Sequence, residues 1–363
     1  MSRILIICTT DSMIWNFLVP HIKELEKRGH YVECACSETG SFFNDLSQKY
    51  NIKMNKICFK RTPYSFRNIK AYRQICRIIK EKRFDTIFCH EPVGGAIGRL
   101  AGHKMKCRIV YMAHGFHFYK GAPKSRIIYY WVEKWLSKYT DVLITINKED
   151  FDASKKMFSR RNVLINGVGI DTGKFSIIQR NEALRKELGF SKNDFVFLSV
   201  GELIKRKNHL SFIKAIAKAN SKCFYIVVGT GSFENKIIKM IKKLKLENRV
   251  FLLGYRNDIK DICSAADAFV MPSIHEGLSV ALMEAMACGK PVIASSIRGN
   301  VDLLEKSKGG ELVDTFDIDG YVEAANRMST LTKSELRLLG LKNADLIKKY
   351  DIDNIKKCIS DLF

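Results

Sequence analysis

Residues 271–301 read MPSIHEGLSVALMEAMACGKPVIASSIRGNV, and this stretch decides the predicted fold. A short apolar run is followed by a glycine turn, by a segment (278–287) with the alanine, leucine and methionine content of a helix, and by a second apolar run from Val292. Gly289 and Pro291 end the predicted helix, because glycine suits the position just past a helix end and proline cannot continue it. The order is strand, turn, helix, strand.

The turn in this stretch combines free backbone N–H groups at a helix start with two nearby carboxylates. The backbone N–H groups of Gly277, Leu278 and Ser279 precede the helix, where the positive end of its dipole favours a phosphate or diphosphate. Carboxylates do not bind phosphate, so Glu276 in the turn and Glu284 in the helix are expected to accept hydrogen bonds from hydroxyls of a sugar and of a ribose. The structural alternative is that Glu276 caps the helix and Glu284 is a solvated helix residue.

The same alternation of apolar runs and helical segments occupies the whole chain of 363 residues. It predicts an α/β protein with two doubly wound parallel sheets, one in each of two Rossmann-like domains. The predicted domains are residues 1–170 and 171–349, and a last helix at about 350–363 is expected to pack back on the first domain. No stretch approaches the roughly 20 apolar residues that span a bilayer, and the opening apolar run is too short for a signal peptide, so a cytoplasmic location is expected. The eleven cysteines contain no C-x-x-C pair, which indicates reduced thiols.

The formal net charge of +23 is unevenly distributed. Residues 1–170 contain 30 Lys and Arg against 14 Asp and Glu, a net charge of +16, which leaves +7 for the remainder. Two basic segments with aromatic and aliphatic residues, 60–83 and 120–138, account for much of this excess. Such a surface is able to contact nucleic acid or anionic lipid, or to be a solvated face, and charge alone does not distinguish these cases.

The motifs resemble those of a known family. The matching pieces are His275-Glu276-Gly277-Leu278, Glu284-Ala285-Met286-Ala287 and 289–294, and, in family order along the chain, His114-Gly115-Phe116, Asn166-Gly167-Val168 with Asp171 and Phe175, Gly201-Glu202-Leu203 with Lys207-Asn208, Gly229 with Gly231, Gly254-Tyr255, and Asp267 with Pro272-Ser273. The chain thereby resembles the retaining glycosyltransferases of GT-B fold, glycosyltransferase family 4, of the type that builds bacterial capsule, exopolysaccharide or O-antigen. The resemblance implies two Rossmann-like domains facing across a cleft, with the first domain receiving the acceptor.

The resemblance also implies roles for individual residues. Glu276 would bind the donor sugar, Lys207 the diphosphate, and His114 would lie near the donor sugar. The family has an arginine where this chain has Glu202, so we expect Arg206 to supply the guanidinium and Lys205 to be solvated. The nucleotide would contact Glu284, the amides of residues 277–279, Gly201, Tyr255 and Arg256. Asn16 and residues 10–13 would lie where the family admits acceptor or phosphate.

No metal and no cofactor are expected. His90-Glu91 and His275-Glu276 lack the second histidine of H-E-x-x-H, and Gly229-Thr230-Gly231 lacks the third glycine of a dinucleotide fingerprint. Three D-x-D sequences, at 150–152, 317–319 and 351–353, each lie beside a predicted helix start, where aspartate is a favoured cap.

The predicted function is transfer of a sugar, of the hexosyltransferase type, from a nucleotide-diphosphate donor to a hydroxyl of an acceptor. UDP is expected from its frequency in the family, and the two basic segments favour a polyprenyl-diphosphate-linked saccharide acceptor and an anionic membrane surface at the inner face of the membrane, with no nucleic-acid partner. Two alternatives stay open, a nucleotide-sugar 2-epimerase of the same fold and a basic membrane-binding or nucleic-acid-binding module.

Overall fold

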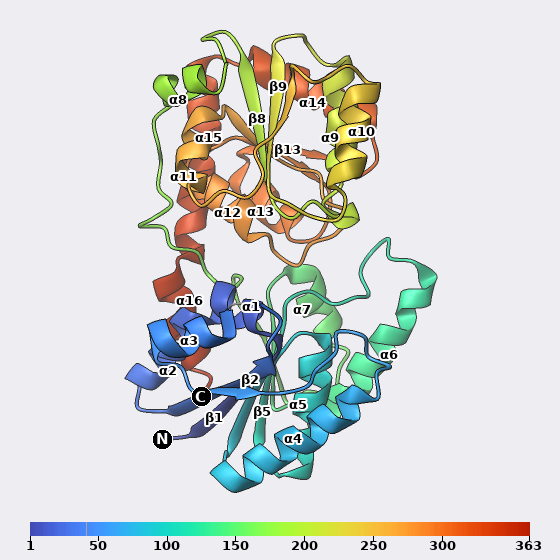
Figure 1. The fold of residues 1–363 in the computed structure, drawn as a ribbon, viewed down its shortest axis with the longest axis vertical. Helices are drawn as coiled ribbons and strands as arrows, with labels where there is room; N and C mark the ends of the chain where they lie inside the picture. Colours follow the sequence, from blue (N-terminus) through green and yellow to red (C-terminus); the bar gives the residue numbers. More distant parts are fainter. Residues whose placement is uncertain (41) are drawn as a thin grey trace. The chain divides into compact units, whose positions relative to one another are not determined.

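The computed structural model of the chain describes residues 1–40 and 42–363. These residues form two compact units, each with its own parallel sheet (Figure 1). Unit 1 consists of Met1–Gly169 and Ile352–Phe363, and unit 2 of Ile170–Asp351.

The sheet of unit 1 has seven parallel strands in the order β3-β2-β1-β4-β5-β6-β7. The strands are β1 (Arg3–Thr10), β2 (Tyr31–Ser37), β3 (Met54–Lys56), β4 (Thr86–His90), β5 (Arg108–Ala113), β6 (Val142–Thr145) and β7 (Arg161–Leu164). Strands β1 and β4 lie side by side, with Ile6 opposite Phe88. Strands β2 and β3 lie on one side of β1, and strands β4 to β7 lie on its other side. The direction of strand succession therefore reverses between β1 and β4.

Helices cover both faces of this sheet. They are α1 (Asp11–Met13), a π-helical turn (Ile14–Leu18), α2 (Val19–Lys27), α3 (Phe42–Tyr50), α4 (Arg67–Lys82), α5 (Pro92–Lys104), α6 (Ile127–Leu136) flanked by the short helices η2 (Lys124–Arg126) and η3 (Ser137–Tyr139), α7 (Lys148–Ser154) and α16 (Ile352–Ser360). Helices α4 and α5 pack on one face through a core that includes Ile75 and Ile97. Helix α16 packs on α2, and the ring of Phe363 lies 5.1 Å from that of Phe88 in β4.

The first helical region of the chain, residues 11–27, is not one continuous α-helix. The chain instead forms α1, a π-turn and α2, and the N–H of Val19 bonds to the carbonyl of Ile14, five residues back. Pro20 follows at the start of α2 and has no N–H to continue the i to i−4 pattern of the preceding turn. The proline therefore explains why the helix is interrupted at this point.

The sheet of unit 2 has six parallel strands in the order β10-β9-β8-β11-β12-β13. The strands are β8 (Phe195–Val200), β9 (Cys223–Val228), β10 (Val250–Leu252), β11 (Ala268–Met271), β12 (Val292–Ser295) and β13 (Gly310–Val313). The helices are α8 (Glu182–Glu187), η4 (Lys205–Lys207), α9 (His209–Lys218), α10 (Glu234–Lys243), α11 (Ile259–Ala265), α12 (Val280–Ala287), α13 (Asn300–Ser307), α14 (Ile318–Thr330), α15 (Lys333–Ile347) and η5 (Lys348–Tyr350).

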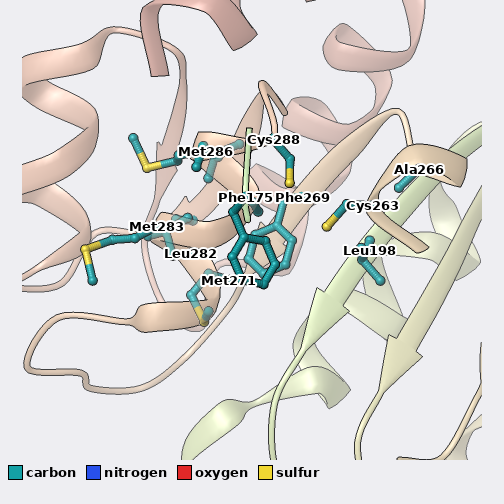
Figure 2. Packing of buried hydrophobic residues seen from close by; sticks show 14 of the residues in the cluster. Phe175, Leu198, Cys263, Ala266, Phe269, Met271, Leu282, Met283, Met286 and Cys288 are labelled. Carbon is teal, nitrogen blue, oxygen red and sulfur yellow. The ribbon is translucent and has the colours of Figure 1, made fainter. Parts of the chain in front are cut away.

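Alternate residues of these strands belong to two separate cores, one on each face of the sheet. Phe197 of β8 packs with α9, α10 and α14, whereas its neighbour Leu198 packs with α11, α12 and α13. Figure 2 shows the second core, which contains Leu282 and Met286 of α12 and Phe269 of β11. Burial on both faces explains why these strands are continuous apolar runs in the sequence. The two predicted doubly wound parallel sheets are thus confirmed.

None of the helices among residues 1–40 and 42–363 is both long enough and apolar enough to cross a membrane.

Candidate active site

In unit 2 the direction of strand succession reverses between β8 and β11, which are adjacent in the sheet. In open parallel sheets the loops that leave two such strands diverge at their carboxyl ends and open a crevice for a ligand. The loop after β8 contains Arg206 and Lys207, and the loop after β11 contains Glu276. The topology therefore brings Glu276 together with Arg206 and Lys207, which lie about 70 positions earlier in the sequence.

The carboxylate of Glu276 lies between two cations. Arg206 Nη1 is 2.6 Å from Oε2, and Lys207 Nζ is 2.9 Å from Oε1. The hydroxyl of Ser273 donates a hydrogen bond to Oε1 at 2.9 Å. Burial opposes ionisation of this carboxyl, but the charges of Lys207 and Arg206 and the hydrogen bonds outweigh burial and lower the pKa of Glu276 to about 2. Glu276 is therefore an ionised hydrogen-bond acceptor at neutral pH.

Hydrogen bonds to backbone carbonyls hold the two loops against each other. The N–H of Ile274 donates to the carbonyl of Arg206 at 2.8 Å, and Asn208 Nδ2 donates to the carbonyl of Pro272 at 3.0 Å. Asn208 has a φ of 54°, a left-handed conformation that asparagine tolerates better than most residues, and it ends η4 before α9 begins. This turn directs the side chains of Arg206 and Lys207 toward Glu276, while Lys205 and Glu202 are exposed.

A third loop, which follows β12, supports the turn from behind. Buried Arg298 donates from Nε to the carbonyl of Glu276 at 3.1 Å. Gly299 has a φ of 81°, and a Cβ at this position would lie 2.4 Å from the carbonyl oxygen of Gly277. Only glycine fits this close approach. The sequence motifs did not predict a role for Arg298. Its position just beyond a buried strand, at the same edge of the sheet, was the signal that could have identified it.

Glu284 projects from α12, one of the helices of the core in Figure 2. Burial raises the pKa of its carboxyl to about 7, against a smaller opposing effect of the Lys174 charge. A carboxyl that is costly to ionise in the empty protein is often a functional group, because a ligand can supply the missing hydrogen bonds. Ser279 caps α12 by accepting a hydrogen bond from the N–H of Leu282, so Glu276 is not the helix cap.

Two other predicted residues of unit 2, Tyr255 and Arg256, lie on a different loop from Glu276, Arg206 and Lys207. Tyr255 is 75% exposed, and Arg256 forms an ion pair with Asp258 through two nitrogens. Both follow β10, which is an edge strand two strands away from β8. Gly201 does join the cluster, since a Cβ there would lie 3.1 Å from Lys207 Cε.

In unit 1 the corresponding reversal of strand succession lies between β1 and β4, and titratable residues lie at the carboxyl ends of β4 and β5. His90 Nδ1 and His114 Nε2 are 3.0 Å apart. Burial lowers the pKa of His114 to about 4 and that of His90 well below its ordinary value, so this pair is neutral at pH 7. Because His114 belongs to unit 1, its predicted role beside the donor sugar stays a prediction.

Glu91 is a candidate site residue that the sequence motifs did not predict. It has a φ of 61°, which is costly for a residue other than glycine, and its Oε2 accepts a hydrogen bond from the N–H of Thr9 at 2.7 Å. Burial raises the pKa of this carboxyl. Residues 10–13 begin the helical region beside it, where Asp11 is buried, and Asn16 is exposed in the π-turn. The position of Glu91 directly after a buried strand was the available sequence signal.

The acids of the D-x-D sequences have structural partners. Asp317 caps α14, as expected. The expectation was wrong for Asp150, which lies inside α7, because Asn147 provides the cap and leaves the Asp150 carboxylate to accept the N–H of Phe116 at 3.1 Å. Asp351 accepts a hydrogen bond from the hydroxyl of Thr172.

Comparisons with known proteins identify relatives along most of the chain. The family model of "Glycosyl transferases group 1" matches residues 180–339, and that of "Glycosyl transferase 4-like" matches residues 3–147. The putative glycosyltransferase EpsD of Bacillus subtilis is 34% identical over 339 residues, which cover 90% of this chain and 87% of that protein. The UDP-Gal:alpha-D-GlcNAc-diphosphoundecaprenol alpha-1,3-galactosyltransferase of Escherichia coli is 32% identical over 311 residues, 82% of this chain and 80% of that protein.

Solved structures share the fold over the full length. HepE of Anabaena, in complex with UDP and glucose, superposes with a TM-score of 0.82 at 19% identity and covers 100% of this chain and 99% of that one. Sucrose-phosphate synthase from Thermosynechococcus elongatus superposes with a TM-score of 0.83 at 18% identity, with 100% and 98% covered. At this level of identity the likeness establishes the fold alone.

Proposed function

The chain belongs to the group 1 glycosyltransferases and has the GT-B fold, and from this premise we propose that it is a retaining transferase that uses a UDP-sugar. The observation that carries the proposal is the group of Glu276, Arg206 and Lys207 at the strand-order reversal of unit 2. It combines an ionised acceptor for sugar hydroxyls with two cations suited to a diphosphate.

The proposed chemistry follows from these charges. The bond between the sugar's anomeric carbon and the diphosphate breaks, the acceptor oxygen bonds to the same face of that carbon, and the acceptor's proton passes to the departing phosphate oxygen. Negative charge grows on the diphosphate as it leaves. Arg206 and Lys207 would stabilise that charge, and their pairing with Glu276 holds both cations in place before the donor binds. Glu284 would accept hydrogen bonds from the ribose.

The names of relatives support the choice of donor and acceptor. The relative from Escherichia coli is a galactosyltransferase that acts from UDP-Gal on a sugar linked to undecaprenyl diphosphate. A protein from Campylobacter jejuni, 25% identical over 363 residues, is named as transferring N-acetylgalactosamine to another undecaprenyl-diphosphate-linked sugar. We infer that this chain also extends a polyprenyl-diphosphate-linked saccharide in the synthesis of a surface polysaccharide. We further infer that it associates peripherally with the inner face of the membrane, which the basic charge of residues 1–170 would favour.

A transfer assay tests this proposal. The purified chain would be incubated with UDP-sugars and a short-chain polyprenyl-diphosphate saccharide, and NMR of the product would report the anomeric configuration. Release of UDP with formation of a product that keeps the donor's configuration is expected. An inverted product would contradict the retaining mechanism. Epimerised donor without transfer would indicate the 2-epimerase instead, and donor left unchanged in the presence of every acceptor would refute the transferase.

A further inference from the structure

Helix α6 of unit 1 has most of its large aliphatic and tryptophan side chains on the outside. Five of them form one stripe along the helix, at spacings that place them on a single face, and are between 43% and 58% exposed. This stripe, called here the α6 ridge, consists of Ile127, Ile128, Trp131, Val132 and Trp135. A surface helix ordinarily buries such a stripe against its own protein.

The inward face of the helix explains this orientation. It buries Glu133 and Leu136, and Glu133 forms an ion pair with Arg99 of α5 at 2.8 Å. Arg99 is fully buried and lies with its guanidinium carbon 3.9 Å from the centre of the Tyr111 ring. Turning the ridge inward would move Glu133 into water and leave the Arg99 charge buried without this partner, which is strongly unfavourable. The buried ion pair therefore fixes the ridge on the outside.

Cations flank the ridge. Residues 120–138 contain five Lys and Arg, and the one acid among them is Glu133, which faces inward. Lys134 Nζ lies 5.7 Å from the centre of the Trp131 ring and 5.3 Å from that of Phe158, which is itself exposed. Lys138 Nζ lies 5.3 Å from the Phe158 ring. Apolar side chains beside lysines, with aromatic rings between them, suit the boundary between lipid tails and anionic head groups.

The apolar surface continues beyond the helix. The ring of Trp135 contacts that of Tyr139 edge-on at 5.6 Å, and Tyr139 stacks on His103 at 4.2 Å. Both Tyr139 and His103 line a groove of about 550 Å³ beside α4 and α5, whose other lining residues include Tyr64, Phe66 and Ile69. The exposed ridge and this groove together form one apolar face of unit 1.

We propose that this face docks on an anionic phospholipid bilayer, with the α6 ridge inserted among the lipid tails and the flanking cations on the head groups. The proposal rests on the proposed function, because a lipid-linked acceptor lies at such a surface. A second copy of the chain is the less suitable occupant, since two faces rich in lysine and arginine repel each other whereas an anionic bilayer complements them.

Tryptophan fluorescence tests the insertion directly. The three tryptophans are Trp15, Trp131 and Trp135, so a Trp15→Phe protein reports from the ridge alone. With vesicles of equal phosphatidylglycerol and phosphatidylcholine, we expect a blue shift and quenching by lipids brominated in the acyl chains. Pure phosphatidylcholine vesicles should give little of either. Emission that stays unchanged with the anionic vesicles would overturn the proposal.

A double variant identifies the surface. Ile128→Glu with Val132→Glu keeps both reporting tryptophans and should lower sedimentation with the anionic vesicles at least about tenfold, because two inserted side chains become charged. Leu338→Glu with Leu341→Glu, two exposed leucines on α15 of unit 2, is the matched control and should sediment like the parent. Equal sedimentation of the ridge variant and the parent would overturn the assignment, as would a parental dimer that the ridge variant abolishes.

Two further measurements separate this inference from the proposed function. UDP-induced thermal stabilisation of both double variants would show that they are folded with an intact donor site. Transfer to a water-soluble acceptor tests the transferase itself and does not require a bilayer. A protein that transfers sugar but fails to bind anionic vesicles would refute the docking face alone, and one that binds vesicles but never transfers would refute the proposed function alone.

Discussion

Replacement of Glu284 by glutamine should stabilise the empty protein and weaken nucleotide binding at the same time. Burial in unit 2 raises the pKa of this carboxyl to about 7, compared with an ordinary value of 4.5. Between these two values the folded state keeps a proton that the unfolded state has lost. Raising the pH through this window therefore lowers the free energy of unfolding of the parent, whereas glutamine does not titrate.

The magnitude follows from the difference between the two pKa values. It is about 2.5 pH units, and at 1.36 kcal/mol per unit it amounts to about 3 kcal/mol when the pH is well above 7. Glu284 is partly exposed, and solvent screening reduces this effect, so we expect about 1–2 kcal/mol. The gain in stability of Glu284→Gln over the parent should thus be small at pH 5 and grow by that amount at pH 8.

Urea unfolding of both proteins at pH 5 and pH 8 measures this difference, and isothermal titration with UDP measures binding. If the ionised carboxylate accepts hydrogen bonds from the ribose, UDP should bind Glu284→Gln at least about tenfold more weakly at pH 8, and the loss should shrink at pH 6, where the parent carboxyl is protonated. UDP itself titrates near pH 6, and the variant's own pH profile serves as the control for that effect. A stability difference that is equal at both pH values would contradict the raised pKa of Glu284, and unchanged UDP affinity would contradict its contact with the ribose.

Three other predictions concern the same unit. Glu276→Gln and Lys207→Ala should each lower kcat/KM at least about tenfold, equivalent to about 1.4 kcal/mol. Lys205→Ala, at an exposed neighbour, is the control and should leave kcat/KM near the parental value. Near-parental turnover in both site variants would contradict the assignment of these residues to the site. EDTA should leave the initial rate of transfer unchanged, and loss of activity that manganese restores would show that a metal takes part. Gly299→Ala should lower the free energy of unfolding by about 1–3 kcal/mol and raise the KM for the donor, because the alanine Cβ would displace the Gly277 carbonyl. Unaltered urea unfolding would show that the loop accommodates the Cβ without strain and would contradict this prediction.

Local sequence patterns are enough to predict the architecture of each unit. Apolar runs such as 195–200 and 268–271 identify strands buried on both faces, and Gly289 with Pro291 marks the end of α12. These signals are local. The spacing of apolar residues, and the backbone conformations that glycine and proline favour, can be recognised within a few consecutive residues. The same locality made the turn around Glu276 recognisable as a candidate site.

The pairing of the charges in the site depends on tertiary contacts. The sequence left it open whether Arg206 turns inward, and the answer depends on the left-handed turn at Asn208 and on the hydrogen bond of that side chain to Pro272, 64 residues away. Similarly, the support that Arg298 gives to Glu276 depends on the adjacency of β11 and β12. Contacts of this kind join residues that the chain separates widely, so no local pattern encodes them.

The orientation of α6 shows the same limit. Its composition predicts an amphipathic segment with aromatic and basic residues, and the ordinary expectation for such a helix is that the apolar stripe faces the core. The structure turns that stripe outward because Glu133 finds a buried partner in Arg99, 34 residues earlier in the chain. Turning the helix would leave the buried Arg99 charge without Glu133, which is strongly unfavourable, and this ion pair exists only once α5 and α6 have packed together.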